Sequence, residues 1–141
     1  MSSLTLPMTA DKLIPHRLPM LLVDELLEVE GKSAVVAAQV SADCPLVDTA
    51  GKLEDIALVE LMAQSHATLN GYCDQLAGTP PRRGFLVGVK KVEWFGSAQV
   101  GDQLLIKIDT LAELDNFVIA GGEIWCGDKM LASGELKAWV D

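Results

Sequence analysis

The stretch that decides the fold runs from Leu53 to Leu76 and reads Leu53-Glu-Asp-Ile-Ala-Leu-Val-Glu-Leu-Met-Ala-Gln-Ser-His-Ala-Thr-Leu-Asn-Gly-Tyr-Cys-Asp-Gln-Leu76. It contains no proline and no glycine except Gly71, and the following Ala77-Gly-Thr-Pro-Pro81 is typical of a helix end. Two carboxylates, Glu54 and Asp55, stand in its first turn, where the helix dipole favours negative charge. The pattern predicts one long helix.

Both flanks of this helix have the composition of β-strands. Upstream, residues 20–40 alternate apolar and polar side chains around the turn Glu30-Gly-Lys-Ser33, which predicts a hairpin. Before the hairpin, Thr9 is expected to cap a short helical turn that Pro15 ends. Downstream, turn residues separate four strands predicted at residues 84–95, 103–114, 117–126 and 130–140. Because no βαβ alternation occurs, we expect an α+β fold in which an antiparallel sheet wraps around one long central helix.

The size and the charge of the chain limit its possible functions. Its 141 residues suffice for a single domain, residues 1–141, with one core. Twenty acidic and eleven basic residues give a net charge of −9, which argues against nucleic acid and anionic membranes as partners. Without a signal-peptide start or a spanning apolar run, we expect a cytoplasmic protein. Three cysteines without CxxC spacing and only two histidines predict neither a disulfide framework nor a metal site.

Glu60 is the only formal charge between Ile56 and Leu69, in a helical segment that is apolar on every side. Such a helix is normally buried, and burial disfavours an ionised carboxyl, so we expect a raised pKa for Glu60, in the range useful for proton transfer. Gln64, one turn further on, can orient the Glu60 carboxyl by a hydrogen bond. In the structural alternative, this side of the helix faces a solvent channel or a subunit seam and Glu60 is merely paired.

The two histidines have separate expected roles. His66 lies roughly 240° around the helix from Glu60, so we expect a packed or seam histidine rather than a dyad partner of Glu60. His16 stands between Pro15 and Pro19, which fix the backbone around it. It is either a loop residue that bonds its own segment or a catalytic candidate.

A local excess of positive charge follows the helix on this otherwise acidic chain. Four basic residues occupy ten positions: Arg82, Arg83, Lys90 and Lys91. They suit an anionic ligand such as a phosphate arm, or an acidic carrier protein, although a solvated basic face explains them equally well. Between them, Gly84 and Gly88 would allow a ligand to approach the backbone closely.

Three segments of the chain together resemble a known family. They are Leu13-Ile-Pro-His-Arg-Leu-Pro-Met-Leu-Leu-Val-Asp24, Val59-Glu-Leu-Met-Ala-Gln64, and Phe85-Leu-Val-Gly-Val-Lys-Lys91 with Gly101-Asp-Gln-Leu104. In this order they resemble the 3-hydroxyacyl-[acyl carrier protein] dehydratases of type II fatty acid synthesis. The resemblance implies a hot-dog fold, and a homodimer or a higher oligomer of dimers with active sites at the subunit seam.

The resemblance also implies roles for particular residues. In the family, a histidine of a His-Phe-Pro loop works with an acidic residue of the partner's helix; Glu60 matches that acidic residue and Gln64 the glutamine one turn later. The segment around Gly88 matches the backbone amide that polarises the thioester carbonyl. The loop Cys44–Leu53 departs from the family pattern because it contains no histidine, and Asp48 or His16 would have to replace it. Relatives with such a shortened loop resemble the dehydratase-like proteins of aryl polyene pathways.

We therefore expect a 3-hydroxyacyl-[acyl carrier protein] dehydratase-like protein whose catalytic candidates are Glu60, Gln64 and His16. The substrate would be carried on the phosphopantetheine of an acyl carrier protein, with no other cofactor and no metal. The substrate-binding candidates are Phe85, Gly88, Arg82, Arg83, Lys90 and Lys91. Two alternatives stay open: a non-catalytic partner subunit of a dehydratase hetero-oligomer, and an acyl thioesterase in which the helix carboxylate activates water.

Overall fold

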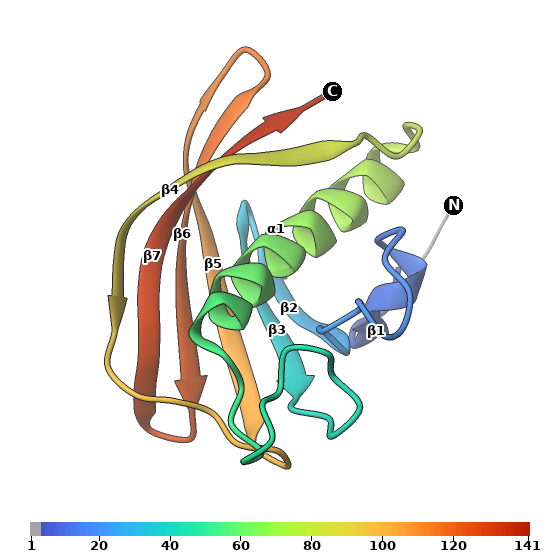
Figure 1. Cartoon of the computed structure of the whole chain (residues 1–141). Coiled ribbons are helices and arrows are strands. Elements are labelled where there is room, and N and C mark those ends of the chain that lie inside the picture. Colours follow the sequence, from blue (N-terminus) through green and yellow to red (C-terminus); the bar gives the residue numbers. More distant parts are fainter. Residues whose placement is uncertain (1–3) are drawn as a thin grey trace.

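The computed structural model describes residues 4–141, which form one long helix and a seven-stranded antiparallel sheet (Figure 1). The strand order is β1-β2-β3-β5-β6-β7-β4, so β1 and β4 are the two edges of the sheet. The elements are β1 (Met8–Thr9), a 3₁₀ helix (Ala10–Lys12), β2 (Glu25–Glu30), β3 (Ser33–Gln39), α1 (Asp55–Ala77), β4 (Gly84–Trp94), β5 (Gln103–Leu114), β6 (Phe117–Cys126) and β7 (Lys129–Val140). The expected α+β architecture is confirmed.

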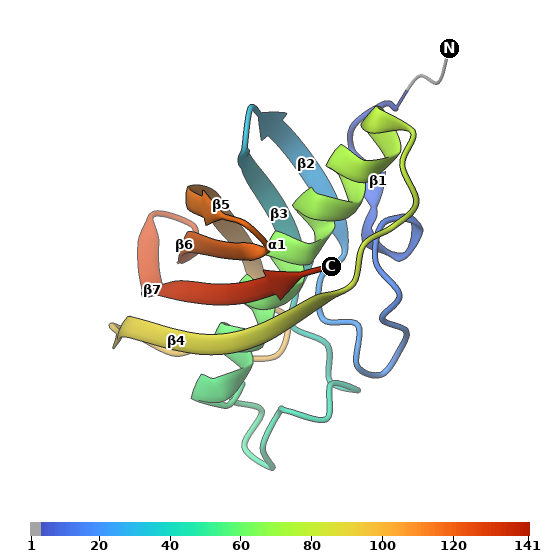
Figure 2. The ribbon, with the colours of Figure 1, turned by 90° about the horizontal axis from the view of Figure 1, so that it is seen from above.

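Helix α1 lies in the hollow of the curled sheet, as the view from above shows (Figure 2). It ends at Gly78, whose left-handed φ of 69° lets its N–H bond the carbonyl oxygens of Asp74 and Gln75. Its sheet-facing side includes Met62, which is fully buried. A side chain at Gly122 of β6 would place its Cβ 2.6 Å from the Met62 sulfur, so glycine permits the close approach of helix and sheet.

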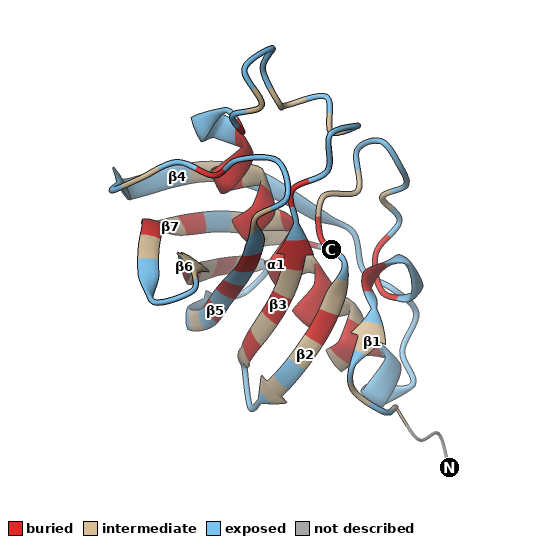
Figure 3. Cartoon of the chain, turned by 90° about the horizontal axis from the view of Figure 1, so that it is seen from below, coloured by how far each residue is buried: buried red, intermediate tan, exposed pale blue. Residues whose placement is uncertain are grey.

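The core lies between α1 and the inner face of the sheet, where the buried bands alternate along the strands (Figure 3). In β5, Leu104, Ile106 and Ile108 are at most 2% exposed, while the residues between them are exposed. This period of two confirms the alternation predicted from the sequence. No helix within residues 4–141 is long and apolar enough to cross a bilayer.

The segment before the hairpin differs from the prediction. Residues 20–23 were expected to begin the first hairpin strand, but β2 begins at Glu25. The reason is a tertiary contact: the Gln64 side chain accepts a hydrogen bond from the Leu22 N–H and donates one to the Met20 carbonyl. These backbone groups are therefore taken by the helix rather than by a neighbouring strand.

The predicted helical turn at residues 9–14 is shorter than expected. It is a 3₁₀ turn of three residues, Ala10–Lys12, and Thr9 makes no side-chain capping bond. The chain then crosses α1 in close contact, since a Cβ added at Gly71 would lie 2.1 Å from the Leu13 carbonyl oxygen. The N-terminal segment is thus packed directly on the helix from Leu13 to Leu22.

Candidate active site

Glu60 and Gln64 stand one turn apart on α1, and their side chains are joined. The Gln64 Nε2 donates to the Glu60 Oε1 at 2.9 Å. Gln64 is only 1% exposed, because the same amide also holds the Met20 carbonyl at 2.8 Å and the Leu22 N–H at 2.8 Å. A side chain with both amide atoms bonded has one orientation, so Gln64 fixes one oxygen of the Glu60 carboxylate, which confirms the hydrogen bond predicted from the sequence.

A cavity of about 310 Å³ opens beside Glu60, between α1 and the strands β4 and β7. Its apolar walls come mainly from alanine, leucine and valine side chains, and its polar groups come from the helix and the N-terminal segment. The lining residues are His16, Glu60, Ala63, Gln64, His66, Ala67, Asn70, Gly84, Phe85, Leu86, Leu136, Ala138 and Val140. The cavity has the composition expected of a site that binds an aliphatic group and holds a few polar groups in place.

Glu60 is less buried than the sequence predicted. It is half-buried, and Ile56, one turn earlier, is 61% exposed, so α1 is not apolar and enclosed on all sides. The reason is that the sheet ends at the edge strand β4, which leaves this side of the helix open. The Glu60 carboxylate therefore lies at the mouth of the cavity rather than in the core.

Both histidines line the same cavity as Glu60. His16 is half-buried, and no hydrogen bond joins it to Glu60 among the described residues. His66 is 4% exposed, in agreement with the expectation of a packed histidine. Burial lowers the pKa of His66, with a smaller opposing effect from Glu113. Its place in the cavity wall was missed, because a helical wheel shows angles around the helix but not the width of the opening beside it.

The four basic candidates do not form one patch. The Arg82 Nε and backbone N–H both donate to the Asp74 carboxylate, at 2.9 and 3.1 Å. Arg83 pairs with Asp141 at 3.1 Å, and both groups are partly exposed.

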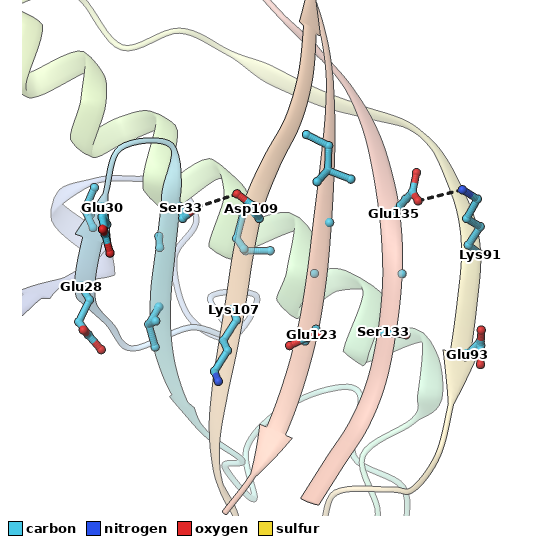
Figure 4. A pocket seen from close by; sticks show the side chains of 18 residues that line it. Glu28, Glu30, Ser33, Lys91, Glu93, Lys107, Asp109, Glu123, Ser133 and Glu135 are labelled. Atoms are coloured by element: carbon cyan, nitrogen blue, oxygen red, sulfur yellow. Dashed lines mark hydrogen bonds and ion pairs between the residues drawn. The ribbon is translucent and has the colours of Figure 1, made fainter. Parts of the chain in front are cut away.

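Lys91 lies away from the Glu60 cavity, on the outer face of the sheet, where it pairs with Glu135 at 3.2 Å (Figure 4). Lys90 is exposed. Three of the four side chains are thus already paired with carboxylates, which weakens the free positive charge expected from the sequence.

The outer face of the sheet has a broad hollow of about 910 Å³, which is larger than the Glu60 cavity (Figure 4). Its carboxylates come from several strands, and some of them are hydrogen-bonded to or paired with other side chains of the same face. For example, the Ser33 hydroxyl donates to Asp109 at 2.6 Å. Lys107 lies over the ring of Trp125, 5.1 Å from its centroid. These side chains do not converge on one point, so the hollow is a solvated sheet face rather than a reaction centre.

The remaining candidates have different positions. Phe85 lines the cavity, whereas Gly88 is half-buried and lies outside the lining. Asp48 does not reach the cavity, because its Oδ1 accepts hydrogen bonds from the N–H groups of Ala50 and Lys52, both at 2.9 Å. Asp48 therefore shapes its own loop, and of the two proposed replacements for the loop histidine only His16 lies beside Glu60.

No group of three or more histidine, cysteine, aspartate or glutamate side chains within residues 4–141 could hold a metal ion. The three cysteines are separate thiols, each half-buried. The polar chemistry of the cavity thus comes from one carboxylate, two amides and two imidazoles.

Comparisons with known proteins identify the family. The family model of the ApeP-like dehydratases matches residues 8–140. A 3-hydroxyacyl-[acyl-carrier-protein] dehydratase FabZ of Natranaerobius thermophilus is 33% identical over 129 residues, and the match covers 89% of each chain. The FabZ of Thermoanaerobacter sp. is 30% identical over 132 residues, again with 89% of each chain covered.

Solved structures agree with these relatives. The dehydratase heterocomplex ApeI:P from Xenorhabdus doucetiae superposes with a TM-score of 0.87 at 25% identity, covering 94% of this chain and 90% of that one. The PaaI protein of E. coli matches with a TM-score of 0.64 at 14% identity, over 81% of this chain and 80% of that one, which shows the fold alone. The fold is the hot-dog fold, and the chain belongs to the ApeP-like dehydratase family of hydro-lyases.

Proposed function

We propose that this protein dehydrates a 3-hydroxyacyl thioester carried on the phosphopantetheine of an acyl carrier protein in the cytoplasm, in fatty acid or polyene biosynthesis. The observation that carries the proposal is the Glu60 carboxylate, held by Gln64 at 2.9 Å at the mouth of a mostly apolar cavity. The apolar walls suit an acyl chain, and the carboxylate suits proton transfer at the reacting end of that chain.

The reaction needs two proton-transfer roles. A base removes a proton from C2, the C2–C3 double bond forms, and the C3–O bond breaks as an acid protonates the departing hydroxyl, which leaves as water. Glu60 and His16 share these roles, because they are the carboxylate and the half-buried imidazole that line one cavity. Gln64 orients Glu60 and leaves its second oxygen free for the substrate.

The carrier and the thioester need their own contacts. We assign Phe85 to the acyl group, since it lines the cavity, and the Gly88 segment to the thioester carbonyl, since it belongs to the same strand. Arg82 and Arg83 come directly before that strand and Lys90 lies within it, and these three residues are the candidates for the acidic carrier. Lys91 faces the outer hollow and would contact the carrier only at a distance from the cavity.

The test is turnover of a 3-hydroxyacyl carrier protein, followed by mass spectrometry of the carrier-bound product. We expect the wild-type chain to form the enoyl carrier, and Glu60→Gln to be slower by about 10²- to 10⁴-fold, the usual effect of losing a general acid or base. Glu54→Gln is the matched control, because Glu54 is the exposed residue directly before the same helix and its side chain makes no capping bond. Equal product from all three proteins removes Glu60 from the reaction.

A second candidate function is that of a partner subunit in a dehydratase hetero-oligomer. Two observations favour it: the likeness to the ApeI:P heterocomplex, and a loop Cys44–Leu53 that contains no histidine. The interface would lie along β4, an edge strand bonded only to β7. Its residues Phe85, Leu86 and Val87 are 44–53% exposed, which is unusual for an unpaired apolar edge.

Assembly decides between the two candidates. A catalytic chain alone forms a homodimer or a higher oligomer of dimers and turns over substrate by itself. A partner subunit co-purifies with a second dehydratase and raises the turnover of that enzyme, and Glu60→Gln leaves this increase unchanged. Light scattering and turnover of the separate and mixed chains distinguish these outcomes.

A further inference from the structure

Four half-buried residues of α1 form one continuous row along the Glu60 cavity: Glu60, Ala63, Ala67 and Asn70. They are three, four and three positions apart, so they lie on one face of the helix, within about 80° of one another. Every other residue between Glu60 and Asn70 is buried. A ligand in the cavity therefore meets α1 mainly along this row, and its two middle side chains are the smallest that carry a Cβ.

Glu60 lies at one end of the cavity. The other helix residues that line the cavity all come after Glu60 in the sequence, and the last of them is Asn70. Ten positions separate these two residues, which is about 15 Å along a helix axis. The strand β4 starts near the Asn70 end, because only residues 78–83 join it to α1, and it runs back along the helix (Figure 1, Figure 2). The cavity is thus elongated along α1, with the carboxylate at one end.

Between these two ends, neither α1 nor β7 offers a free polar side chain to a ligand. Both amide atoms of Gln64 are bonded to protein partners, and His66 is only 4% exposed. His16, the remaining polar residue of the lining, acts in the proposed reaction. The wall opposite the helix consists of the β7 residues Leu136, Ala138 and Val140. A pantetheine arm would lose water from its amide groups here, whereas an alkyl chain would gain from burial, so this space suits the acyl chain.

We propose that Ala63 and Ala67 are specificity-determining residues, which set the length of the acyl chain that the cavity accepts between Glu60 and Asn70. The inference rests on the proposed function, because it concerns the substrate of the same cavity. An extended chain advances about 1.1–1.2 Å per bond, so the distance of about 15 Å holds about 13 bonds. The substrate class is then an acyl thioester with up to about 13 carbon atoms beyond the reacting carbons.

The direction of the chain narrows the choice among the basic candidates for the carrier. When the acyl chain extends towards Asn70, the thioester and the carrier lie at the Glu60 end. Arg82 lies beyond the opposite end, since it pairs with Asp74, which follows Asn70 on α1. Lys90 lies further along β4 than the residues that line the cavity, in the direction of the Glu60 end (Figure 1). Lys90 is therefore the basic candidate on the side of the thioester.

The experiment measures the Kd of saturated acyl thioesters of N-acetylcysteamine over a series of chain lengths. These probes have no 3-hydroxyl group, so they report binding without turnover. For the wild-type chain, Kd should fall by about two- to fourfold per added methylene while the chain fills the cavity, and should level off beyond about 13 bonds. In Ala67→Leu and Ala63→Leu it should level off at about 9 and about 4 bonds, because these residues lie about 10.5 and 4.5 Å from Glu60 along the helix.

Ala77→Leu is the matched control, because Ala77 is exposed on the same helix and lies outside the cavity lining. It should level off at the same chain length as the wild-type chain, and circular dichroism confirms that each variant is folded. A wild-type Kd that does not change with chain length, or a levelling-off that neither cavity variant moves, overturns the inference. If the levelling-off moves as expected but no enoyl product forms from a 3-hydroxyacyl carrier, the proposed reaction fails while the assignment of chain length stands.

Discussion

Replacing Gly71 by alanine tests whether the contact between α1 and the N-terminal segment holds the site together. A Cβ at residue 71 would lie 2.1 Å from the Leu13 carbonyl oxygen, far inside van der Waals contact. The obstructing atom belongs to the backbone and cannot rotate away, so the segment must move. Leu13 is three residues before His16, and the same segment is bonded to Gln64 at Leu22, so the movement reaches the cavity.

The size of the effect follows from two opposing contributions. In an unobstructed helix, alanine would stabilise the protein by about 1 kcal/mol relative to glycine. Overpacking typically costs about 1–3 kcal/mol, and each Gln64 hydrogen bond to the shifted segment adds about 1 kcal/mol if it is lost. We therefore expect a net loss of about 1–3 kcal/mol. With an unfolding entropy of about 2.1 cal/mol/K per residue over 141 residues, Tm should fall by about 3–10 °C.

Thermal unfolding followed by circular dichroism measures this change, and enoyl formation measures its effect on the cavity. Gly88→Ala is the matched control for stability, because the nearest atom to its added Cβ is the Lys137 Cβ at 3.9 Å, an ordinary contact. Its stability should change by no more than about 0.5 kcal/mol. A rise in Tm for Gly71→Ala would mean that helix propensity alone acts at residue 71, and it would refute the packing of Leu13 on the helix.

Three further predictions concern other parts of the molecule. Burial lowers the pKa of His66 from its ordinary 6.5. The contribution of the neutral imidazole to stability is therefore complete above about pH 6.5 and is lost as the pH falls through the folded-state pKa. In urea unfolding at neutral and mildly acidic pH, the free energy of unfolding should fall less for His66→Gln than for the wild-type chain. Arg82→Ala leaves the buried Asp74 without its guanidinium partner and should lower the free energy of unfolding in urea by about 1–2 kcal/mol. The loss is smaller than for a fully buried pair, because Arg82 is partly exposed. Adding Asp74→Asn to this variant should recover part of the loss. If the chain assembles through the exposed edge of β4, as proposed, Val87→Lys should convert the assembly to monomer in light scattering without lowering Tm by more than a few degrees. An assembly that Val87→Lys leaves unchanged would mean that its interface lies elsewhere.

The regular part of the fold was predictable because its signals are local. The long helix, its end at Gly78 and the alternation along β5 follow from residues within one turn or one strand, and the structure agrees with them. The strand predicted around Met20 was wrong, because the conformation of this segment depends on Gln64, which is 44 residues away in the sequence. A run of apolar residues cannot indicate that a distant amide will take its backbone groups.

The site was predictable in its chemistry and less so in its surroundings. The lone charge of Glu60 and the spacing to Gln64 were sufficient to find the joined pair. The exposure of Glu60 depends on where the sheet ends, and the position of His66 in the cavity wall depends on how the sheet curls. The sequence of the helix alone contains neither of these two features of the sheet. The pairing of Arg82 with Asp74 across the helix end likewise arises from the path of the loop between α1 and β4.

The rate at which the purified chain converts a 3-hydroxyacyl carrier protein to the enoyl carrier, measured beside Glu60→Gln and Glu54→Gln, tests the central claim most directly. The account predicts that Glu54→Gln matches the wild-type rate while Glu60→Gln loses at least about 100-fold, with both variants equally folded. A Glu60→Gln protein that dehydrates the carrier-bound substrate as fast as the wild-type chain would contradict it.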